Sequence, residues 1–215
     1  MIVKMFVSKP IRFTVAIDGP AAAGKGTVAK GLADHFGFAY LDTGLLYRAV
    51  AAKALLGEDV ITAANKLVPT DMASQTLRSP EVAQMASKVA VIPQVRAALL
   101  AFQKSFACQD GGAVLDGRDI GTMVCPEAKI KIFITASAEI RAKRRYDELQ
   151  SKGLETSYEV VLCEVKERDE RDMTRKDAPL KRAQDAYLLD TSDLSIVASL
   201  QRAINITSAA FVKVI

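Results

Sequence analysis

Cysteine and histidine are scarce in this sequence. Its 215 residues contain one histidine and three cysteines, Cys108, Cys125 and Cys163, with no CxxC pair among them. An odd number of widely spaced cysteines argues against a disulfide framework. We therefore expect the three thiols to be reduced, buried and unreactive.

Long apolar runs are lacking as well. The longest apolar stretches, residues 49–56 and 97–102, are bounded or interrupted by charges well before the roughly 20 residues that a membrane helix needs. Residues 1–10 contain no continuous apolar segment followed by a small-residue cleavage site. We therefore expect no transmembrane helix, no membrane partner and a cytoplasmic location.

The chain has little excess of one charge sign. Its formal net charge is +4, and basic residues mostly alternate with acidic ones, so a nucleic-acid partner is not expected. A hydrophobic share of 50% with 25% charged residues is typical of a globular protein. At this length we expect one domain with its own core.

Hydrophobic patterning predicts an alternation of strands and helices. The predicted strands cover residues 12–18, 38–42, 113–116, 128–135 and 187–190. The predicted helices cover residues 25–36, 45–56, 81–106 with an interruption at Pro93, and 194–203, while residues 57–80 predict a short helix and a loop. This order predicts an α/β fold in which helices cover both faces of a five-stranded parallel sheet.

Four predicted strands end in an aspartate, namely Asp18, Asp42, Asp116 and Asp190. Ligands of parallel sheets bind beyond the carboxyl ends of the strands, so we expect these aspartates to line the binding crevice. For Asp42 and Asp116 two interpretations remain open: they orient Mg²⁺-bound water or arginines, or they only bond to the backbone at the strand end.

A phosphate-binding loop is predicted between the first strand and the first helix. The segment G-P-A-A-A-G-K-G-T fits G-x-x-x-x-G-K, in the strand-to-helix context that this P-loop motif requires. Its backbone N–H groups and the helix N-terminus suit a triphosphate such as ATP. The predicted ATP-binding residues are Gly19, Pro20, Ala21, Ala22, Ala23, Gly24, Lys25, Gly26 and Thr27, with Lys25 reaching the β and γ phosphates.

Magnesium ligation is less regular in this loop. The common motif has Ser or Thr directly after the lysine, whereas here Gly26 separates Lys25 from Thr27. We therefore expect Mg²⁺ to be held through Thr27 or through water.

Arginines are concentrated in the second half of the chain. Arg141, Arg144 and Arg145 open one predicted helix, and residues 166–175 read K-E-R-D-E-R-D-M-T-R. Arginines at positions 168, 171 and 175 would share one helix face and match the oxygens of a transferring phosphoryl group. Beside a phosphate loop, this favours an arginine-rich lid over a solvated helix of Glu/Arg pairs.

Seven stretches of the chain together resemble bacterial cytidylate kinases, of the nucleoside monophosphate kinase superfamily. In order, they are IDGPAAAGKGT, FAYLDTGLLYRAVA, EVAQMASKVAVIPQVRAALLAFQ, VLDGRDIGTMVCPEAKIKIFITAS, RAKRRYDELQSKG, EVKERDERDMTRKDAPL and LLDTSDLSI. The resemblance covers nearly the whole chain, and DGRDIGT and KERDERD after LDTGLLYR do not fit adenylate, guanylate or thymidylate kinases.

The resemblance implies a site for the phosphate of a nucleoside monophosphate. Arg48 and Arg118 would bind this phosphate, helped by Lys25 and Arg175, with Thr43 beside it. The catalytic residues that the resemblance implies are Lys25, Arg118, Arg168 and Arg175.

The resemblance also implies a nucleoside site. Ser87, Arg96 and Asp119 would read cytosine, whose exocyclic amine and ring acceptors need both acceptors and donors. Arg168 and Asp172 would contact the sugar, and the deoxy form would be accepted too. The implied reaction is phosphorylation of CMP or dCMP by ATP with Mg²⁺, in a monomer.

The implied architecture is a single P-loop kinase domain with three parts. The core comprises residues 11–56, 107–140 and 183–215, a small monophosphate-binding subdomain comprises about 57–106, and the arginine-rich lid about 141–182. Two other functions stay open: a kinase for another small acceptor, such as UMP or shikimate, and a non-catalytic ATP-binding switch.

The sequence departs from the family pattern at three places. Thr43 stands where serine is common, and Ala22 stands where the loop often has glycine, so the backbone turn there must be feasible for alanine. Residues 69–78 are much shorter than the corresponding insertion that closes over CMP in many bacterial members.

Overall fold

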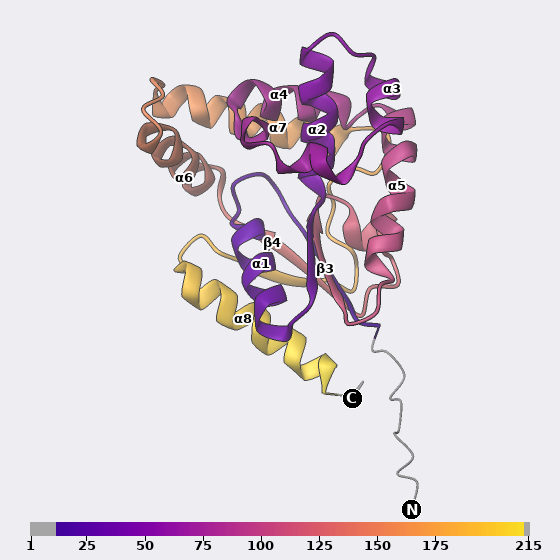
Figure 1. The fold of residues 1–215 in the computed structure, drawn as a ribbon. Helices are drawn as coiled ribbons and strands as arrows, with labels where there is room; N and C mark the ends of the chain where they lie inside the picture. The colour runs from indigo at the N-terminus through magenta and orange to yellow at the C-terminus, as the bar shows by residue number, and fades with distance from the viewer. Residues whose placement is uncertain (1–11, 213–215) are drawn as a thin grey trace, which may run out of the picture.

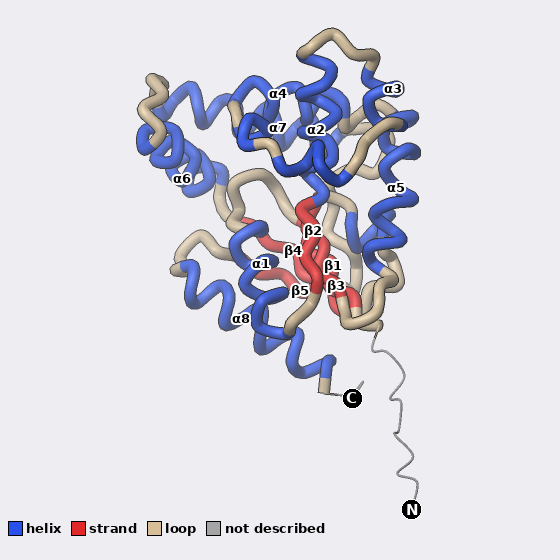
Figure 2. Tube along the Cα trace, in the orientation of Figure 1, coloured by secondary structure: helices blue, strands red, loops and turns tan. Residues whose placement is uncertain are grey.

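A five-stranded parallel sheet forms the centre of the protein, as a computed structural model of residues 12–212 shows (Figures 1 and 2). The strand order is β2-β3-β1-β4-β5. The strands are β1 (Thr14–Asp18), β2 (Ala39–Asp42), β3 (Ala113–Gly117), β4 (Ile130–Thr135) and β5 (Tyr187–Asp190). The predictions for residues 1–11 and 213–215, including that of no signal sequence, lie outside the described residues.

The described part of the chain also contains eight α-helices, some beside the sheet and others beyond its carboxyl edge (Figure 1). They are α1 (Lys25–Phe36), α2 (Thr43–Leu55), α3 (Val60–Asn65), α4 (Pro80–Val89), α5 (Pro93–Ala107), α6 (Ala138–Ser151), α7 (Tyr158–Thr174) and α8 (Ile196–Phe211). Two short 3-10 helices, η1 (Pro69–Ala73) and η2 (Gln75–Arg78), follow α3, and a turn of π-helix, η3 (Ile120–Val124), follows β3.

Both faces of the sheet are covered, as the alternation of β1 illustrates. Val15 and Ile17 pack with side chains of α1 and α8, whereas Ala16, on the opposite face, packs with Leu115 and with Ala107 of α5. Consecutive strand residues point to opposite faces, so these fully buried positions mark two apolar layers. The predicted three-layer α/β fold is therefore confirmed.

The helical pattern of residues 81–106 is divided into two elements. α4 ends at Val89, α5 begins at Pro93, and their axes differ by 99°. Proline lacks the N–H that an interior position must donate but suits the first position of a helix, so Pro93 begins α5. Among residues 12–212 no single helix is long and apolar enough to cross a membrane, and this bent pair passes such a test only when taken together.

Two smaller apolar clusters lie outside the sheet. One joins α2, α3, α4 and α5 around Leu46, Val50, Val82 and Leu99. The other joins α6 and α7 around Ala142, Leu149, Val161 and Val165. The two helix groups thus have their own cores, beyond the carboxyl edge of the sheet (Figure 1).

The prediction that all three cysteines are buried is wrong for two of them. Cys125 is buried, which raises the pKa of its thiol to about 12, but Cys108 and Cys163 are exposed. Cys108 caps the C-terminus of α5, and Cys163 lies on the outer side of α7. All three are free thiols, as expected.

Candidate active site

The predicted phosphate loop connects β1 to α1 and folds around the side chain of Lys25. Lys25 is the first residue of α1, is only 6% exposed, and donates from Nζ to the carbonyl oxygen of Pro20 at 2.8 Å. The loop thereby holds its lysine in place, with the N-terminus of α1 behind it.

Three loop residues, Gly19, Ala22 and Gly24, have a positive φ. Gly19 has φ of 149°, and a Cβ atom at this position would lie 1.8 Å from the carbonyl oxygen of Ile134, so only glycine fits. Ala22 has φ of 59°, a conformation that costs an L-residue with a Cβ roughly 1–2 kcal/mol. The turn at Ala22 is thus feasible for alanine, but strained.

The four strand-end aspartates lie at the same edge of the sheet but have different partners. Asp18 accepts the backbone N–H groups of Ile120 and Gly121, each at 2.7 Å, and fixes η3. Asp42 caps α2 by accepting from the N–H of Gly44, and Asp190 accepts from Ser192. For these three, backbone bonding is therefore the observed role.

Asp116, the fourth strand-end aspartate, lies near Lys25 and bonds to a side chain. Its Oδ2 accepts the hydroxyl of Tyr40 at 2.7 Å. Burial, followed by the nearby Asp42, raises the pKa of Asp116 to about 6, while Lys25 opposes this shift. Burial of Asp18 likewise raises its pKa to about 6.

Lys25 lies in a field of mixed charges. Burial and then the positive charge of Arg118 lower the pKa of Lys25 to about 7, whereas Asp116 and Asp42 oppose the change. A lysine that is buried beside an arginine has an incompletely compensated charge. Such a group favours binding of an anion.

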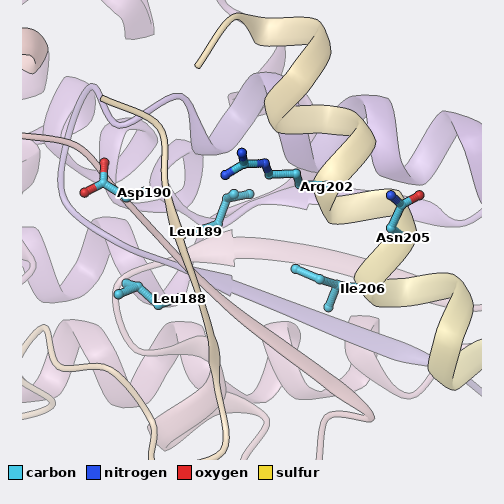
Figure 3. A pocket seen from close by; sticks show the side chains of 6 residues that line it. All are labelled: Leu188, Leu189, Asp190, Arg202, Asn205 and Ile206. Atoms are coloured by element: carbon cyan, nitrogen blue, oxygen red, sulfur yellow. The ribbon is translucent and has the colours of Figure 1, made fainter. Parts of the chain in front are cut away.

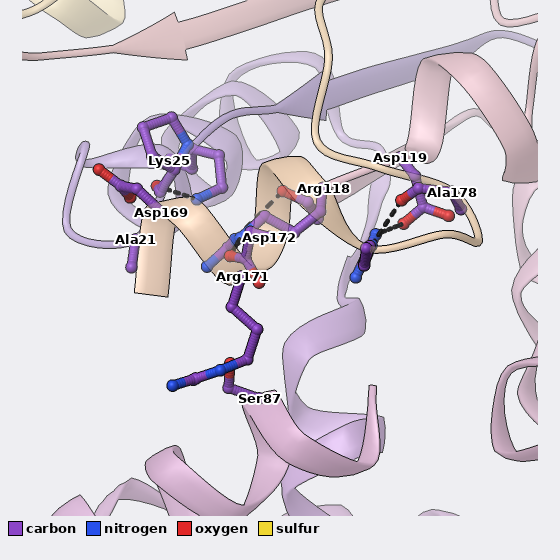
Figure 4. Close-up of polar contacts among 12 residues, drawn as sticks. Ala21, Lys25, Ser87, Arg118, Asp119, Asp169, Arg171, Asp172 and Ala178 are labelled. Carbon is purple, nitrogen blue, oxygen red and sulfur yellow. Dashed lines mark hydrogen bonds and ion pairs between the residues drawn. The ribbon is translucent and has the colours of Figure 1, made fainter. Parts of the chain in front are cut away.

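Arg118 and Arg168 form the centre of a cationic cluster. Arg118 donates from Nε to Oδ2 of Asp172 at 2.8 Å and from Nη1 to the carbonyl of Gly117 (Figure 4). Arg168 Nε is buried and has no hydrogen-bond partner in the part of the chain that the structure describes. Burial and the proximity of Arg118 lower the pKa of Arg168 to about 10. An orphaned guanidinium N–H among cations is a donor suited to an anionic oxygen.

Arg48 approaches the same cluster from α2. It donates from Nη1 to the carbonyl of Leu77 at 2.8 Å. Burial lowers the pKa of Arg48, and the charges of Arg145 and Arg118 lower it further, although Asp42 opposes them. Arg48 therefore lies near Arg118, and the two guanidinium groups come from different elements.

A second group of charges surrounds Asp119, just after β3. Arg96 of α5 forms an ion pair with Asp119 and donates to the hydroxyl of Tyr47 at 3.3 Å. Arg175 reaches the other carboxylate oxygen of Asp119 at 3.4 Å and donates to the carbonyl of Ala178. The expected base-reading residues Arg96 and Asp119 therefore contact each other directly.

The expectation that arginines 168, 171 and 175 share one helix face is only partly correct. α7 ends at Thr174, so Arg175 is its C-cap and turns toward Asp119. Arg168 faces Arg118, while Arg171 donates to Ser87 Oγ on α4 (Figure 4). Arg171 and Arg175 therefore bind different partners, whereas Arg168 Nε has none among the described residues.

Thr43 begins α2 and is buried beside the end of β3. Its hydroxyl donates to the backbone carbonyl of Asp116 at 2.7 Å. The hydroxyl proton is thus used to join α2 to the strand end, so only its acceptor lone pairs remain.

The arginines that open α6 fasten the lid region to the core. Arg141 donates to both carboxylate oxygens of Asp169, at 2.9 and 2.5 Å, and to the carbonyl of Ala21 in the phosphate loop at 3.3 Å. Arg144 donates to Thr191. Solvated ion pairs, the alternative interpretation of these helices, do occur on the outer side of α6, as in Lys143–Asp147.

Residues 69–78, the short segment, form η1 and η2 beside α2. Lys53 forms an ion pair with Asp71 at 3.1 Å, and Arg48 donates a hydrogen bond to the carbonyl oxygen of Leu77. This segment and the α6–α7 loop line a cavity of about 640 Å³ whose walls include Met72, Arg78, Lys152 and Leu154. Another cavity, of about 490 Å³, lies between β5 and α8 (Figure 3).

Several residues of the site were not predicted from the sequence. Tyr40, Tyr47 and Asp169 each form a side-chain hydrogen bond with a charged residue of the site. The two residues of each pair are at least 28 positions apart in the sequence. No local pattern marks them, since their partners come from other elements. For metal binding, the described residues contain no group of three His, Cys, Asp or Glu, and Thr27 is exposed at the start of α1.

The strand order, the loop with its buried lysine and the helical cover define a P-loop kinase fold. Two solved structures share this fold: an uncharacterized protein from Eubacterium ventriosum (TM-score 0.58, 14% identity, 92% of this chain and 99% of that chain) and a gluconokinase from Sinorhizobium meliloti 1021 (TM-score 0.51, 12% identity, 95% and 97%). At these identities the likeness concerns the fold alone.

Sequence comparison identifies the family. The family profile described as cytidylate kinase matches residues 15–72 and 58–209. Proteins named cytidylate kinase from Cereibacter sphaeroides (59% identity, 90% of this chain and 94% of that protein) and Paramagnetospirillum magneticum (60% identity, 84% and 90%) are similar to it. The chain belongs to the cytidylate kinase family, as the resemblance implied.

Proposed function

We propose that this protein transfers the terminal phosphoryl group of ATP to CMP or dCMP and forms ADP with CDP or dCDP. The observation that carries this proposal is the buried, unpartnered Nε of Arg168 beside Arg118, near the lysine of the phosphate loop. This arrangement provides a second anion pocket close to the first, which a transfer between two phosphates requires.

The donor is bound by residues 19–27, where the loop N–H groups and Lys25 contact the β and γ phosphates of ATP. Mg²⁺ would be held through Thr27 or through water, with phosphate oxygens among its other ligands. Asp116 would orient metal-bound water, and Asp42, which caps α2, lies close to it. The metal neutralises phosphate charge when bound.

The acceptor phosphate is bound by Arg48 and Arg118, with Lys25 and Arg175 nearby and Thr43 beside it. The base is read by Ser87, Arg96 and Asp119. The sugar contacts Arg168 and Asp172, and the pairing of Asp172 with Arg118 couples the sugar site to the phosphate site.

The chemical step needs no covalent enzyme intermediate. A phosphate oxygen of CMP, already anionic, forms a bond to the γ phosphorus, while the bond from this phosphorus to the β–γ bridging oxygen breaks and ADP leaves. Lys25, Arg118, Arg168 and Arg175 neutralise the charge that is spread over the transferring group.

We assign different roles to three parts of the chain. Residues 57–106 act as the monophosphate-binding subdomain and 141–182 as the lid, on a core of residues 11–56, 107–140 and 183–215. The α6–α7 cluster supports the lid, and the α2–α5 cluster supports the subdomain but also includes α2, which belongs to the core. We also propose that the protein acts as a monomer.

A panel of acceptors tests the proposal. Purified protein is supplied with ATP and Mg²⁺ and with CMP, dCMP, UMP, AMP, GMP or shikimate, and ADP formation is measured. We expect CMP and dCMP to be preferred. A preference for AMP overturns the assignment, and nucleotide binding without stimulation by any acceptor favours a binding module.

Two variants test the site itself. Lys25→Ala and Arg118→Ala should each lower kcat by at least about a hundredfold, the usual cost of losing one preorganised charge-stabilising group. Lys143→Ala, an exposed cation of α6, is the matched control and should retain activity. Full turnover by either variant contradicts the proposed roles.

A further inference from the structure

A single hydrogen bond connects the helix α7 to the helix α4. Arg171 donates from Nη1 to Oγ of Ser87 at 2.9 Å, across 84 residues of sequence (Figure 4). Ser87 is 5% exposed and belongs to the buried face of α4, together with Val82, Ala83 and Ala86. Within residues 12–212 the Ser87 hydroxyl has no other hydrogen-bond partner, so the guanidinium defines its environment.

The bond joins two bodies that pack separately. α4 contributes Val82, Ala86 and Val89 to the apolar cluster of α2–α5, while α7 contributes Val161 and Val165 to the cluster shared with α6. No apolar cluster of the described residues contains side chains of both α4 and α7. The Arg171–Ser87 bond is therefore a polar contact formed when α7 lies against α4.

The chemistry of the two groups fixes what remains available. A hydroxyl has one donor hydrogen and two acceptor lone pairs, whereas a guanidinium only donates. Arg171 thus occupies a lone pair of Ser87 and leaves the O–H free to donate. A cationic donor on the oxygen also polarises this O–H and strengthens its bond to an acceptor.

The neighbours of Arg171 on α7 belong to the phosphate side of the site. Asp172, the next residue, holds Arg118, and Arg168, one turn earlier, lies beside that arginine. Because a helix moves as one piece, the position of α7 that forms the Arg118–Asp172 pair also brings Arg171 to Ser87.

We propose that Arg171 is a positioning residue for base selection. It holds the Ser87 hydroxyl so that the O–H points to a ring acceptor of the base, and it does so only while α7 lies against α4. Recognition of the base and assembly of the phosphate pocket then form one event. This inference rests on the proposed function, in which Ser87 contacts the base.

A double-mutant cycle tests the proposal. Arg171→Ala, Ser87→Ala and the double variant are compared with wild type for kcat and KM with CMP and with UMP, and for CMP affinity by calorimetry without ATP. Losing one such bond should raise the KM for CMP by about tenfold in Arg171→Ala, with kcat changed by less than about threefold. The double variant should equal Ser87→Ala, because Arg171 acts through that hydroxyl.

A conservative variant and a control complete the experiment. Arg171→Gln keeps an N–H donor without the charge and should recover most of the CMP affinity. Lys166→Ala, an exposed cation of the same helix, should behave as wild type. Melting temperatures of all variants report folding. If Ser87→Ala fails to fold, the comparison of Arg171→Gln with Arg171→Ala tests the proposal instead. Arg171→Gln should then bind CMP more tightly than Arg171→Ala, and equal affinities contradict the proposal.

Three results overturn the inference. Effects of the two substitutions that multiply in the double variant show independent roles. A fall in kcat with unchanged KM shows that Arg171 acts on the transferring group. An equal rise in KM with CMP and with UMP, or no rise with either, shows that Arg171 has no role in base selection. In each case wild-type turnover of CMP leaves the proposed function intact, whereas lack of that turnover defeats the function itself.

Discussion

Arg118 and Asp172 form an ion pair of 2.8 Å that joins the end of β3 to α7, although 54 residues separate them. Their side chains are 19% and 7% exposed. Asp172 is thus the carboxylate that compensates an arginine lying beside Lys25 and Arg168, and its pKa is lowered by these arginines despite burial, which acts in the opposite direction.

Asp172→Asn should destabilise the protein by about 3 kcal/mol, because removing one partner leaves a buried, uncompensated guanidinium. Urea denaturation measures the change. Asp147→Asn, which breaks the exposed pair with Lys143, is the control and should cost less than about 1 kcal/mol. An equal, small decrease in the free energy of unfolding in both variants would show that water reaches Arg118 freely.

Nucleotide binding should be accompanied by proton uptake at Lys25. Its pKa in the free protein is lowered to about 7, so at pH 8 most molecules carry the neutral amine, and a bound triphosphate favours the ammonium form. Calorimetry of ATP binding in two buffers of different ionisation enthalpy should give about one proton taken up at pH 8 and less at pH 6. Lys25→Met should abolish the uptake; an unchanged uptake in this variant assigns the proton to another group.

Gly19→Ala should destabilise the fold by at least about 3 kcal/mol, since its Cβ meets the Ile134 carbonyl at 1.8 Å and β4 must move. Gly24→Ala is the matched control: its φ is 87°, but open space surrounds the added atom, so about 1–2 kcal/mol is expected. Chemical denaturation of both variants gives the comparison. Similar losses of stability in the two variants would mean that backbone strain, and not the clash with Ile134, causes the destabilisation.

Ala22→Gly should stabilise the protein slightly. Relief of the left-handed strain gains roughly 1–2 kcal/mol, and the greater freedom of glycine in the unfolded chain offsets about 0.4–1 kcal/mol of this gain. Ala23→Gly, at a fully buried position, should instead destabilise. A lower midpoint of unfolding for Ala22→Gly would show that its methyl group makes contacts worth more than the strain.

Asp18 should make stability fall as pH rises from about 4 to about 6. Its pKa is raised from 3.8 to about 6 by burial, so the folded state binds the proton more tightly; the stability gained is complete below the unfolded pKa and lost through the folded pKa. The shift corresponds to about 3 kcal/mol. Urea unfolding at several pH values measures the free energy of unfolding as a function of pH. In Asp18→Asn the part of this pH dependence that comes from Asp18 should be missing, and the part that comes from Asp116 should remain. An unchanged slope would refute the assignment to Asp18.

The sequence predicted those features that depend on local order. The strands, the loop around Lys25 and the break at Pro93 follow from short-range periodicity and backbone chemistry, and the structure agrees within a few residues. Arg96 and Asp119 were assigned to one site because of the family resemblance and not because of periodicity, and in the structure they form an ion pair.

Contacts between distant elements were not predictable in this way. The spacing of Arg168, Arg171 and Arg175 suggested one face, but α7 ends at Thr174. Arg171 bonds to Ser87 and Arg175 to Asp119, while Arg168 lies beside Arg118. The role of Tyr40 depends on β2 lying next to β3, and the exposure of Cys163 depends on which side of α7 packs against α6. Residue spacing alone does not contain this information.

The two exposed thiols give the native chain a pair of labelling sites. Cys108 ends α5 and Cys163 lies on α7, whereas Cys125 is shielded from a dye. Fluorophores attached at both positions would report, by energy transfer, how far α7 travels relative to α5 when nucleotides are added, without any engineered substitution.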